Sequence, residues 1–245
     1  MHNKKIRIAK LLSYYNQGSR REIEKLISQR KIYLNNNLVQ SPVTFANEED
    51  RIIVNDKIVI FKKEVEVFKF YKPYEVICSK NKQDNKKIIY EILDEKFKNF
   101  IFAGRLDFKS EGLLILSNTS DLTRNLELPK NRFERKYEVR VFGFMNIDIL
   151  RKKSQGCIVG GIKYRPFKFK IKSKIKKNTI IEMILTEGKK NEIREIFKSM
   201  NLQVNRLKRL SFGPFTLGNM KPGELKKLTK KEIINYENYI GNKKG

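Results

Sequence analysis

The hydrophobic pattern changes near residue 63, and this change limits the folds open to the 245-residue chain more than any other feature. Before it, apolar side chains recur at helical spacing and then give way to very short strands. After it, residues 64–70 alternate polar and apolar side chains, which is typical of a half-buried strand. We therefore expect two domains, residues 1–62 and 63–240, with a short linker containing Lys62 and Lys63 and a flexible tail at 241–245.

The first segment predicts two helices followed by small strands. Residues 8–15 place apolar side chains on one helical face. Ser19 and Glu22 stand three residues apart, which is the spacing of a capping box, so a second helix is expected to begin there. Short strands are expected at residues 31–34, 52–54 and 58–60, with a tight turn at 35–37.

The second segment mixes strands and helices. Strands are expected at residues 64–70, 101–103, 113–116, 137–141 and 180–185. Helices are expected at residues 87–97 and 191–200, and a last one from Thr229, where Glu232 completes a second capping box. No internal repeat of 20–50 residues is visible.

Basic side chains outnumber acidic ones by two to one. The chain holds 54 Lys and Arg against 27 Asp and Glu, a net charge of +27. Residues 1–63 hold 13 basic and 6 acidic side chains, and the remaining residues hold 41 and 21, so both segments are basic. Such an excess requires a polyanionic partner, and rRNA, tRNA, DNA or an anionic membrane would all serve.

The composition excludes several chemistries. The single histidine, His2, stands near the N-terminus, which argues against a histidine-based metal site or catalytic triad. Cys78 and Cys157 are isolated, which suits a reduced cytoplasm better than a disulfide framework. No apolar run approaches the ~20 residues of a membrane span, and the first residues lack a signal-peptide pattern. Catalysis must therefore rest on Asp, Glu, Lys, Arg, Tyr or hydroxyl groups.

A polar loop between two expected strands, residues 104–112, is the first candidate site. Glycine stands at each end, and Asp107 provides a carboxylate with a basic neighbour in sequence. Loops held between rigid strands commonly carry functional side chains. The alternative is an ordinary turn aspartate beside a surface salt bridge.

Residues 186–197 form a second candidate, in which a strand ends, Gly188 turns the chain and a helix begins. Helix N-termini attract phosphate, and Lys189 and Lys190 add positive charge. Arg194 lies beside the apolar helix face, where a partly buried guanidinium would need a carboxylate such as that of a loop Asp. The alternative is a solvated basic helix face.

Two further basic runs suit RNA. Residues 132–141 place Tyr137 among arginines and lysines, an arrangement in which bases stack while cations hold phosphates. Tyr137 could equally be an ordinary strand residue. Arg20 and Arg21 begin the second helix and could grip a phosphate backbone or form a charged solvent face.

In this order, the segments resemble the RNA pseudouridine synthases, in the branch that modifies a single uridine of bacterial ribosomal RNA. Residues 104–118 are similar to that family's Gly-Arg-Leu-Asp signature, which implies that Asp107 is the catalytic carboxylate. Lys136 and Tyr137 match its Lys-Tyr strand, which implies that Tyr137 stacks near the target base and assists proton transfer. Arg105 and Lys136 are then expected to contact the substrate.

Residues 187–194 resemble the third motif of the same family. The resemblance implies that Arg194 pairs with Asp107 and that Ile193 lines the pocket. Residues 71–73 and 206–214 resemble the entry and closing segments of the catalytic domain. Residues 19–35 are similar to the small RNA-binding domain named after ribosomal protein S4, which implies that Arg20 and Arg21 contact RNA.

The resemblance, with the pattern, implies an α+β fold: a small helix-plus-strand RNA-binding domain, then a larger synthase domain with a mixed, mainly antiparallel sheet. The implied reaction isomerises one uridine to pseudouridine in the cytoplasm, by a monomer, without cofactor or metal. The expected partner is ribosomal RNA, preferably 23S, because the chain resembles the large-subunit synthase B type. A 16S enzyme, an enzyme on tRNA or DNA, and a non-catalytic ribosome-assembly protein remain as alternatives.

Overall fold

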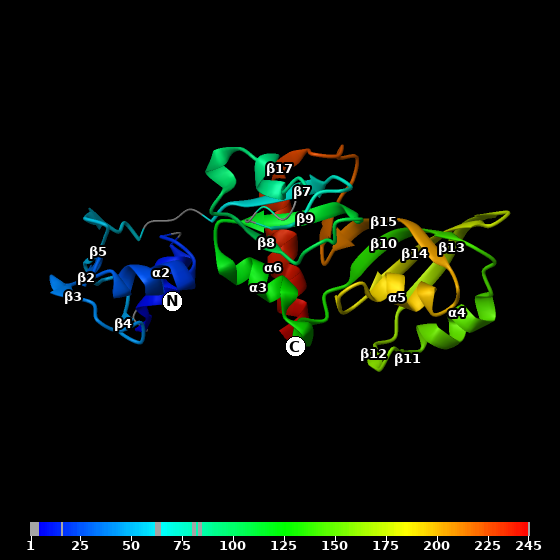
Figure 1. The fold of residues 1–245 in the computed structure, drawn as a ribbon, viewed down its shortest axis with the longest axis horizontal. Helices are drawn as coiled ribbons and strands as arrows, with labels where there is room; N and C mark the ends of the chain where they lie inside the picture. Colours follow the sequence, from blue (N-terminus) through cyan, green and yellow to red (C-terminus); the bar gives the residue numbers. More distant parts are fainter. Residues whose placement is uncertain (1–4, 16, 62–64, 80–81, 83–84, 245) are drawn as a thin grey trace. The chain divides into compact units, whose positions relative to one another are not determined.

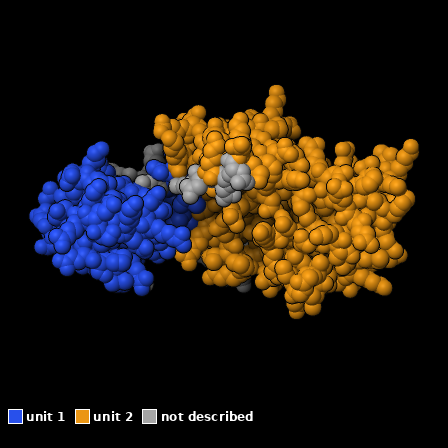
Figure 2. All heavy atoms as spheres, viewed as in Figure 1, with its two compact units in different colours: residues 1–66, 99–101, 118–120 blue, residues 67–98, 102–117, 121–245 orange. Residues whose placement is uncertain are grey.

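The computed structural model describes residues 5–15, 17–61, 65–79, 82 and 85–244 (Figure 1). Its backbone contacts divide the chain into two compact units, which Figure 2 colours separately. One unit holds residues 1–66 with 99–101 and 118–120, and the other holds 67–98, 102–117 and 121–245. The first division falls after residue 66, close to the boundary expected near 63. Lys62 and Lys63, expected in the linker, lie outside the described residues.

The first unit is built from two short helices and small strands. Its elements are β1 (Ile6–Arg7), α1 (Ile8–Tyr14), α2 (Arg20–Ser28), β2 (Ile32–Leu34), β3 (Asn37–Leu38), β4 (Phe45–Ala46), β5 (Ile52–Val54) and β6 (Lys57–Ile58). The predicted capping box is present, because the Glu22 amide donates to the Ser19 hydroxyl (3.2 Å) and the Ser19 amide donates to the Glu22 carboxylate (2.6 Å). Asn35 and Asn36 both have positive φ, as a two-residue hairpin turn requires. The strand expected at 58–60 is instead β6, displaced toward the N-terminus.

The core of the first unit lies between its helices and the β2–β5 pair. Ile8, Leu12 and Ile23 of the helices are fully buried in one apolar cluster with Ile32 and Ile52. These residues are the ones that the helical and strand periodicities place on inward faces. The small unit therefore has its own hydrophobic core.

The second unit is organised around one large sheet, which runs in the order β13-β14-β10-β15-β9-β7-β17 (Figure 1). Its strands are β7 (Val67–Lys72), β8 (Ile101–Ala103), β9 (Glu111–Ser117), β10 (Arg135–Phe142), β13 (Lys168–Ile175), β14 (Asn178–Leu185), β15 (Gln203–Phe212), β16 (Phe215–Thr216) and β17 (Leu225–Lys227). β15 pairs with β9 in parallel, and the other strand pairs of this sheet for which the structure gives a register are antiparallel. The expected mixed, mainly antiparallel sheet is confirmed.

The helices and turns of the second unit differ more from expectation. They are η1 (Ile89–Glu91), η2 (Glu95–Phe97), α3 (Ser120–Glu127), η3 (Pro129–Asn131), α4 (Ile147–Ser154), α5 (Glu192–Lys198) and α6 (Lys230–Lys244), with a hairpin of β11 (Cys157–Val159) and β12 (Ile162–Tyr164). The helices expected from residues 191 and 229 are present as α5 and α6. The pattern did not reveal α3, α4, the hairpin, β13 or β15.

The prediction of a helix at residues 87–97 is wrong, because the structure has only two short 3-10 turns there. Ile77 and Ile88 form a parallel bridge in which the Ile77 amide donates to the Lys87 carbonyl (2.9 Å) and the Ile89 amide donates to the Ile77 carbonyl (2.9 Å). This pairing holds Ile88 in an extended conformation, so only the short 3-10 turns η1 and η2 follow. A long-range backbone contact has overridden the local helical spacing.

The chain end also differs from the expected tail, because α6 continues through residues 241–244. Tyr236 and Tyr239 of this helix stack on Phe133, at ring separations of 6.5 and 5.4 Å. This aromatic packing anchors the preceding turns to the core of the second unit, so the helix can extend beyond them. In the described residues, no helix combines the length and apolar character needed to cross a bilayer.

Gly112 permits the close approach of β9 and β15 that joins the two halves of the sheet. Its φ is +108°, and a Cβ here would lie 2.4 Å from the carbonyl oxygen of Arg209. We expect Gly112→Ala to lower the free energy of unfolding by at least about 4 kcal/mol, measured by urea unfolding. Gly218 also has positive φ but open space around it, so Gly218→Ala should cost only about 1 kcal/mol. Equal losses in the two variants would contradict a steric role for Gly112.

Candidate active site

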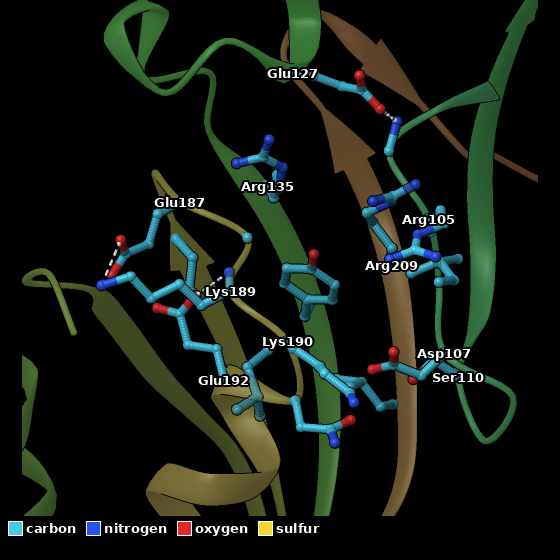
Figure 3. A pocket seen from close by; sticks show the side chains of 18 residues that line it. Arg105, Asp107, Ser110, Glu127, Arg135, Glu187, Lys189, Lys190, Glu192 and Arg209 are labelled. Atoms are coloured by element: carbon cyan, nitrogen blue, oxygen red, sulfur yellow. Dashed lines mark hydrogen bonds and ion pairs between the residues drawn. The ribbon is translucent and has the colours of Figure 1, made fainter. Parts of the chain in front are cut away.

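A cavity of about 330 Å³ lies in the second unit where three of the candidate segments meet. The loop at residues 104–110, strand β10 and the segment at 185–193 line it. Figure 3 shows Arg105, Asp107 and Arg209 on one side of the cavity and Glu187, Lys189 and Glu192 on the other. Of the predicted site residues, the structure brings Arg105, Asp107, Tyr137 and Ile193 to this cavity.

The loop that presents Asp107 is held by hydrogen bonds to its backbone. The Asp107 carbonyl accepts from the Ser110 amide (3.0 Å), and the Phe108 carbonyl accepts from the Glu75 amide (2.9 Å). The Asp107 side chain itself is exposed at the cavity. A fixed backbone therefore presents an exposed carboxylate to the cavity.

Two cationic side chains hold the next two carbonyls of the same loop. Arg194 donates from Nη2 to the Lys109 carbonyl (2.5 Å), and Lys72 donates from Nζ to the Ser110 carbonyl (2.6 Å). Four consecutive carbonyls, from residue 107 to residue 110, are thus engaged by hydrogen bonds. Three of these four hydrogen bonds come from residues outside the loop, which hold residues 108–110 in place.

Arg194 does not make the direct ion pair with Asp107 that the resemblance implied. Among the described residues, the hydrogen bonds of its guanidinium go to the carbonyls of Lys109 and Val204 (2.5 and 2.8 Å), and it lies outside the lining of the cavity. Burial lowers the pKa of Arg194, while the negative charge of Asp107 raises it. Arg194 therefore positions the loop and acts on Asp107 through space.

Lys72, from the end of β7, is completely buried behind the loop. Burial lowers its pKa to about 8, and the Asp107 and Glu111 carboxylates oppose this fall while the Arg209 charge adds to it. The charges of Asp107 and Arg209 are therefore close enough to Lys72 to change its pKa.

The lowered pKa of Lys72 predicts a specific dependence of stability on pH. Between pH 8 and pH 10.5 the native state has released this proton while the unfolded state still holds it, so stability rises with pH. Relative to Lys72→Met, the wild-type free energy of unfolding should rise by on the order of 3 kcal/mol across this window. Chemical unfolding at several pH values measures the difference, with the exposed Lys168→Met as control. A free-energy difference between wild type and Lys72→Met that stays constant over this pH range would contradict the lowered pKa of Lys72.

Strand alternation separates two residues that were expected to act together. Arg135 and Tyr137 are buried on the face of β10 that lines the cavity, whereas Lys136 points to the opposite face and pairs with Glu182 (3.3 Å). Successive side chains of a strand point to opposite faces of its sheet. Lys136 therefore lies outside the lining of this cavity, and its contact with the substrate stays a prediction.

Arg135 and Arg209 line the cavity but were not predicted as site residues. Their guanidinium groups lie 4.5 and 5.0 Å from the centre of the Phe212 ring. Arg209 also donates from Nε to the Leu113 carbonyl (2.7 Å), and its buried Nη2 has no hydrogen-bond partner in the described part of the chain. The alternation of β15, which puts Leu207 and Arg209 on one face, is the signal that could have identified Arg209.

Glu192 is a second cavity residue that the sequence reasoning missed. It is 4% exposed, and its carboxylate accepts from the Lys189 amide (3.1 Å). Burial, together with the negative charge of Glu187, raises the pKa of Glu192 to about 7. The first residue of α5 therefore adds an acid that is partly protonated at neutral pH.

Arg20 and Arg21 belong to the first unit. Both are exposed in the first turn of α2, where helix geometry leaves their side chains accessible to solvent. The cavity itself combines four acidic side chains, three arginines and two lysines with the Tyr137 ring and the aliphatic side chains of Leu185, Ile193 and Leu207. Such a lining can stack a planar base, bind an anionic backbone and place a nucleophile or base beside them.

Comparison with known proteins agrees with this arrangement. The family described as RNA pseudouridylate synthase matches residues 66–199, and the S4 domain matches residues 6–52. An RNA pseudouridine synthase of Rickettsia felis is 36% identical, covering 92% of this chain and 97% of the relative. Ribosomal large subunit pseudouridine synthase B of Buchnera aphidicola (subspecies Schizaphis graminum) is 32% identical, covering 97% of this chain and 98% of the relative.

A solved structure shows the same fold. A crystal structure of a pseudouridylate synthase superposes with a TM-score of 0.66 at 24% identity, covering 94% of this chain and 98% of that one. The S4 match falls in the first unit and the synthase match lies mainly in the second, where it includes the 104–110 loop, β10 and α5. The protein is therefore a member of the RNA pseudouridine synthase family with an N-terminal S4 domain.

Proposed function

We propose that the enzyme converts one uridine of ribosomal RNA, in the 23S RNA of the large subunit, to pseudouridine. One observation carries the proposal: Asp107, Tyr137 and Ile193, from three separate segments, line a single cavity in a chain of this family. The likeness to a large-subunit synthase B over 97% of the chain supports the 23S target. A ribosomal RNA substrate would place the reaction in the cytoplasm.

The reaction exchanges two bonds within one nucleotide. The bond from the ribose C1′ to N1 of uracil breaks, the bond from C1′ to C5 forms, and the proton leaves C5 while N1 gains one. The target base must leave its stack, since C1′ and C5 are inaccessible in a helix. The 330 Å³ cavity is of a size to hold that base.

Asp107 is proposed as the nucleophile or base that starts this exchange. Lys72 and Arg194, which hold the loop, place two positive charges behind it. The hydrogen bonds to the loop backbone would keep the carboxylate oriented without occupying its oxygens.

Tyr137 and Arg209 are proposed to act on the substrate directly. The Tyr137 ring can stack on the uracil, and its hydroxyl is a candidate acceptor for the proton that leaves C5. Arg209 has a buried N–H group with no partner among the described residues, which a phosphate or a uracil carbonyl would satisfy.

The first unit is proposed to bind RNA away from the chemistry. Its S4 match and the net charge of +7 on residues 1–63 support this role, and Arg20 and Arg21 would contact phosphates. We further propose that residues 1–62 and 63–240 act as separate RNA-binding and catalytic domains.

The function is tested with 23S and 16S RNA labelled with tritium at C5 of uridine. The label is released only when C5 forms the new bond to ribose. We expect release from 23S RNA and none from 16S RNA, and mapping of pseudouridine in rRNA from a deletion strain should show one missing site. Release from 16S RNA alone would overturn the large-subunit target, and no release from either RNA would overturn the ribosomal substrate.

A further inference from the structure

A second cavity, of about 760 Å³, lies in the same unit as the first. It is lined by Gln155 and Gly156, which follow α4, by the β11–β12 hairpin, by Arg165 and Pro166, and by Lys189. Lys189 also lines the first cavity. Lys189 therefore forms part of the wall of both cavities.

This shared wall is held by a network around Glu187. Its carboxylate accepts from the Arg165 amide (2.6 Å) and lies 3.4 Å from the Lys189 ammonium. The ammonium also donates to the Lys163 carbonyl and lies 5.6 Å from the centre of the Tyr164 ring. Glu187 lines the first cavity while Arg165, Lys163 and Tyr164 line the second, so the same contacts shape both.

The second cavity combines an apolar lining with a cationic rim. Cys157, Ile158 and Pro166 supply apolar surface, and Ile158 is 67% exposed, unusually open for a large aliphatic side chain. Lys163 and Arg165 supply positive charge. An unpaired nucleotide has the matching chemistry, because its base has flat apolar faces and its phosphate is anionic.

The covalent connection between neighbouring nucleotides indicates which unpaired nucleotide could reach the second cavity. If the target uridine occupies the first cavity, its covalently linked neighbours lie within one nucleotide's length of it, and Lys189 borders both this cavity and the second one. We propose that the second cavity binds the base of a nucleotide directly adjacent to the target uridine, and thereby helps to select the sequence around it. This inference rests on the proposed RNA isomerisation and adds a second subsite to it.

The test compares RNAs that lack one base. A substrate stem-loop is prepared intact, with an abasic residue on the 5′ or the 3′ side of the target, and with an abasic residue several positions away as control. Tritium release is measured with wild type, Ile158→Ala and Ile175→Ala, the last being an equally exposed isoleucine (69%) outside the cavity. Ile158 is exposed, so its replacement should leave folding intact.

We expect one adjacent abasic site to raise the wild-type KM by about tenfold, with kcat changed little. Ile158→Ala should raise KM on intact RNA by about fivefold but add nothing on that abasic RNA, because the contact is already lost. Ile175→Ala and the distant abasic site should have no effect. Equal effects of Ile158→Ala on intact and abasic RNA, or no effect of either adjacent abasic site, would overturn the subsite. Absence of any product with intact RNA would instead count against the proposed function.

The rate of alkylation of Cys157, which lines the second cavity, reports directly whether a base occupies that cavity. Burial raises the pKa of its thiol, so alkylation is followed at mildly alkaline pH and located by mass spectrometry, with Cys78 as internal reference. Intact RNA should slow alkylation of Cys157, and the adjacent abasic RNA at the same saturation should not. Equal protection by both RNAs would show that the base does not enter this cavity.

Discussion

Asp107→Asn is expected to abolish pseudouridine formation while leaving RNA affinity unchanged. The substitution keeps the size of a side chain that is exposed at the cavity, and the loop carbonyls remain bound to Lys72 and Arg194. It removes the negative charge and the nucleophilic oxygen, so turnover should fall by at least about 10⁴-fold. Single-turnover tritium release and an RNA-binding titration measure the two properties separately.

The matched control for this prediction is Asp148→Asn, which changes an exposed carboxylate on α4 outside the cavity. Its activity and affinity should both equal those of the wild type. If the turnover of Asp107→Asn stayed within tenfold of the wild-type value, Asp107 would not be the catalytic carboxylate. A parallel loss of RNA affinity would instead show that the carboxylate organises the binding surface.

Arg194→Ala is expected to lower kcat by about 10²- to 10³-fold with little change in KM. The guanidinium joins the Asp107 loop to β15 through the Lys109 and Val204 carbonyls, so its loss frees the loop and removes a positive charge near the carboxylate. Because Arg194 lies outside the cavity lining, substrate contacts should persist. Steady-state kinetics on the same stem-loop separates the two parameters.

Two further variants serve as controls for Arg194→Ala. Lys198→Ala, on the exposed end of the same helix, should leave kcat unchanged. Arg194→Lys keeps the charge but cannot reach both carbonyls with a rigid fork, so it should restore only part of the activity. If KM rose as steeply as kcat fell, Arg194 would be a substrate contact rather than a positioning residue.

Local pattern was sufficient where the signals came from neighbouring residues. The Ser19–Glu22 and Thr229–Glu232 capping boxes form as predicted, because each needs only groups three residues apart. The amphipathic spacing of α5 and the alternation of β10 were likewise visible. These local signals also placed Asp107 in a loop between strands.

Local pattern failed where a distant segment competed with it. Residues 87–97 have helical spacing but lose it to the bridge with Ile77. Lys136 stands beside Tyr137 in sequence and yet lies on the opposite face of the sheet. Arg209 and Glu192 became cavity residues through strand register and helix packing, neither of which adjacent residues specify.

By itself, the sequence determined the class of the protein and its main chemistry: a strongly basic two-part chain whose motif order is that of an RNA pseudouridine synthase. Hydrophobic periodicity and helix capping depend on residues only a few positions apart, so the sequence alone reveals them. The tertiary structure alone decided which side chains share a cavity and which only support it. Arg194 became a support for the loop, and Arg209 entered the cavity, because the pairing of β9 with β15 brings together residues about a hundred positions apart.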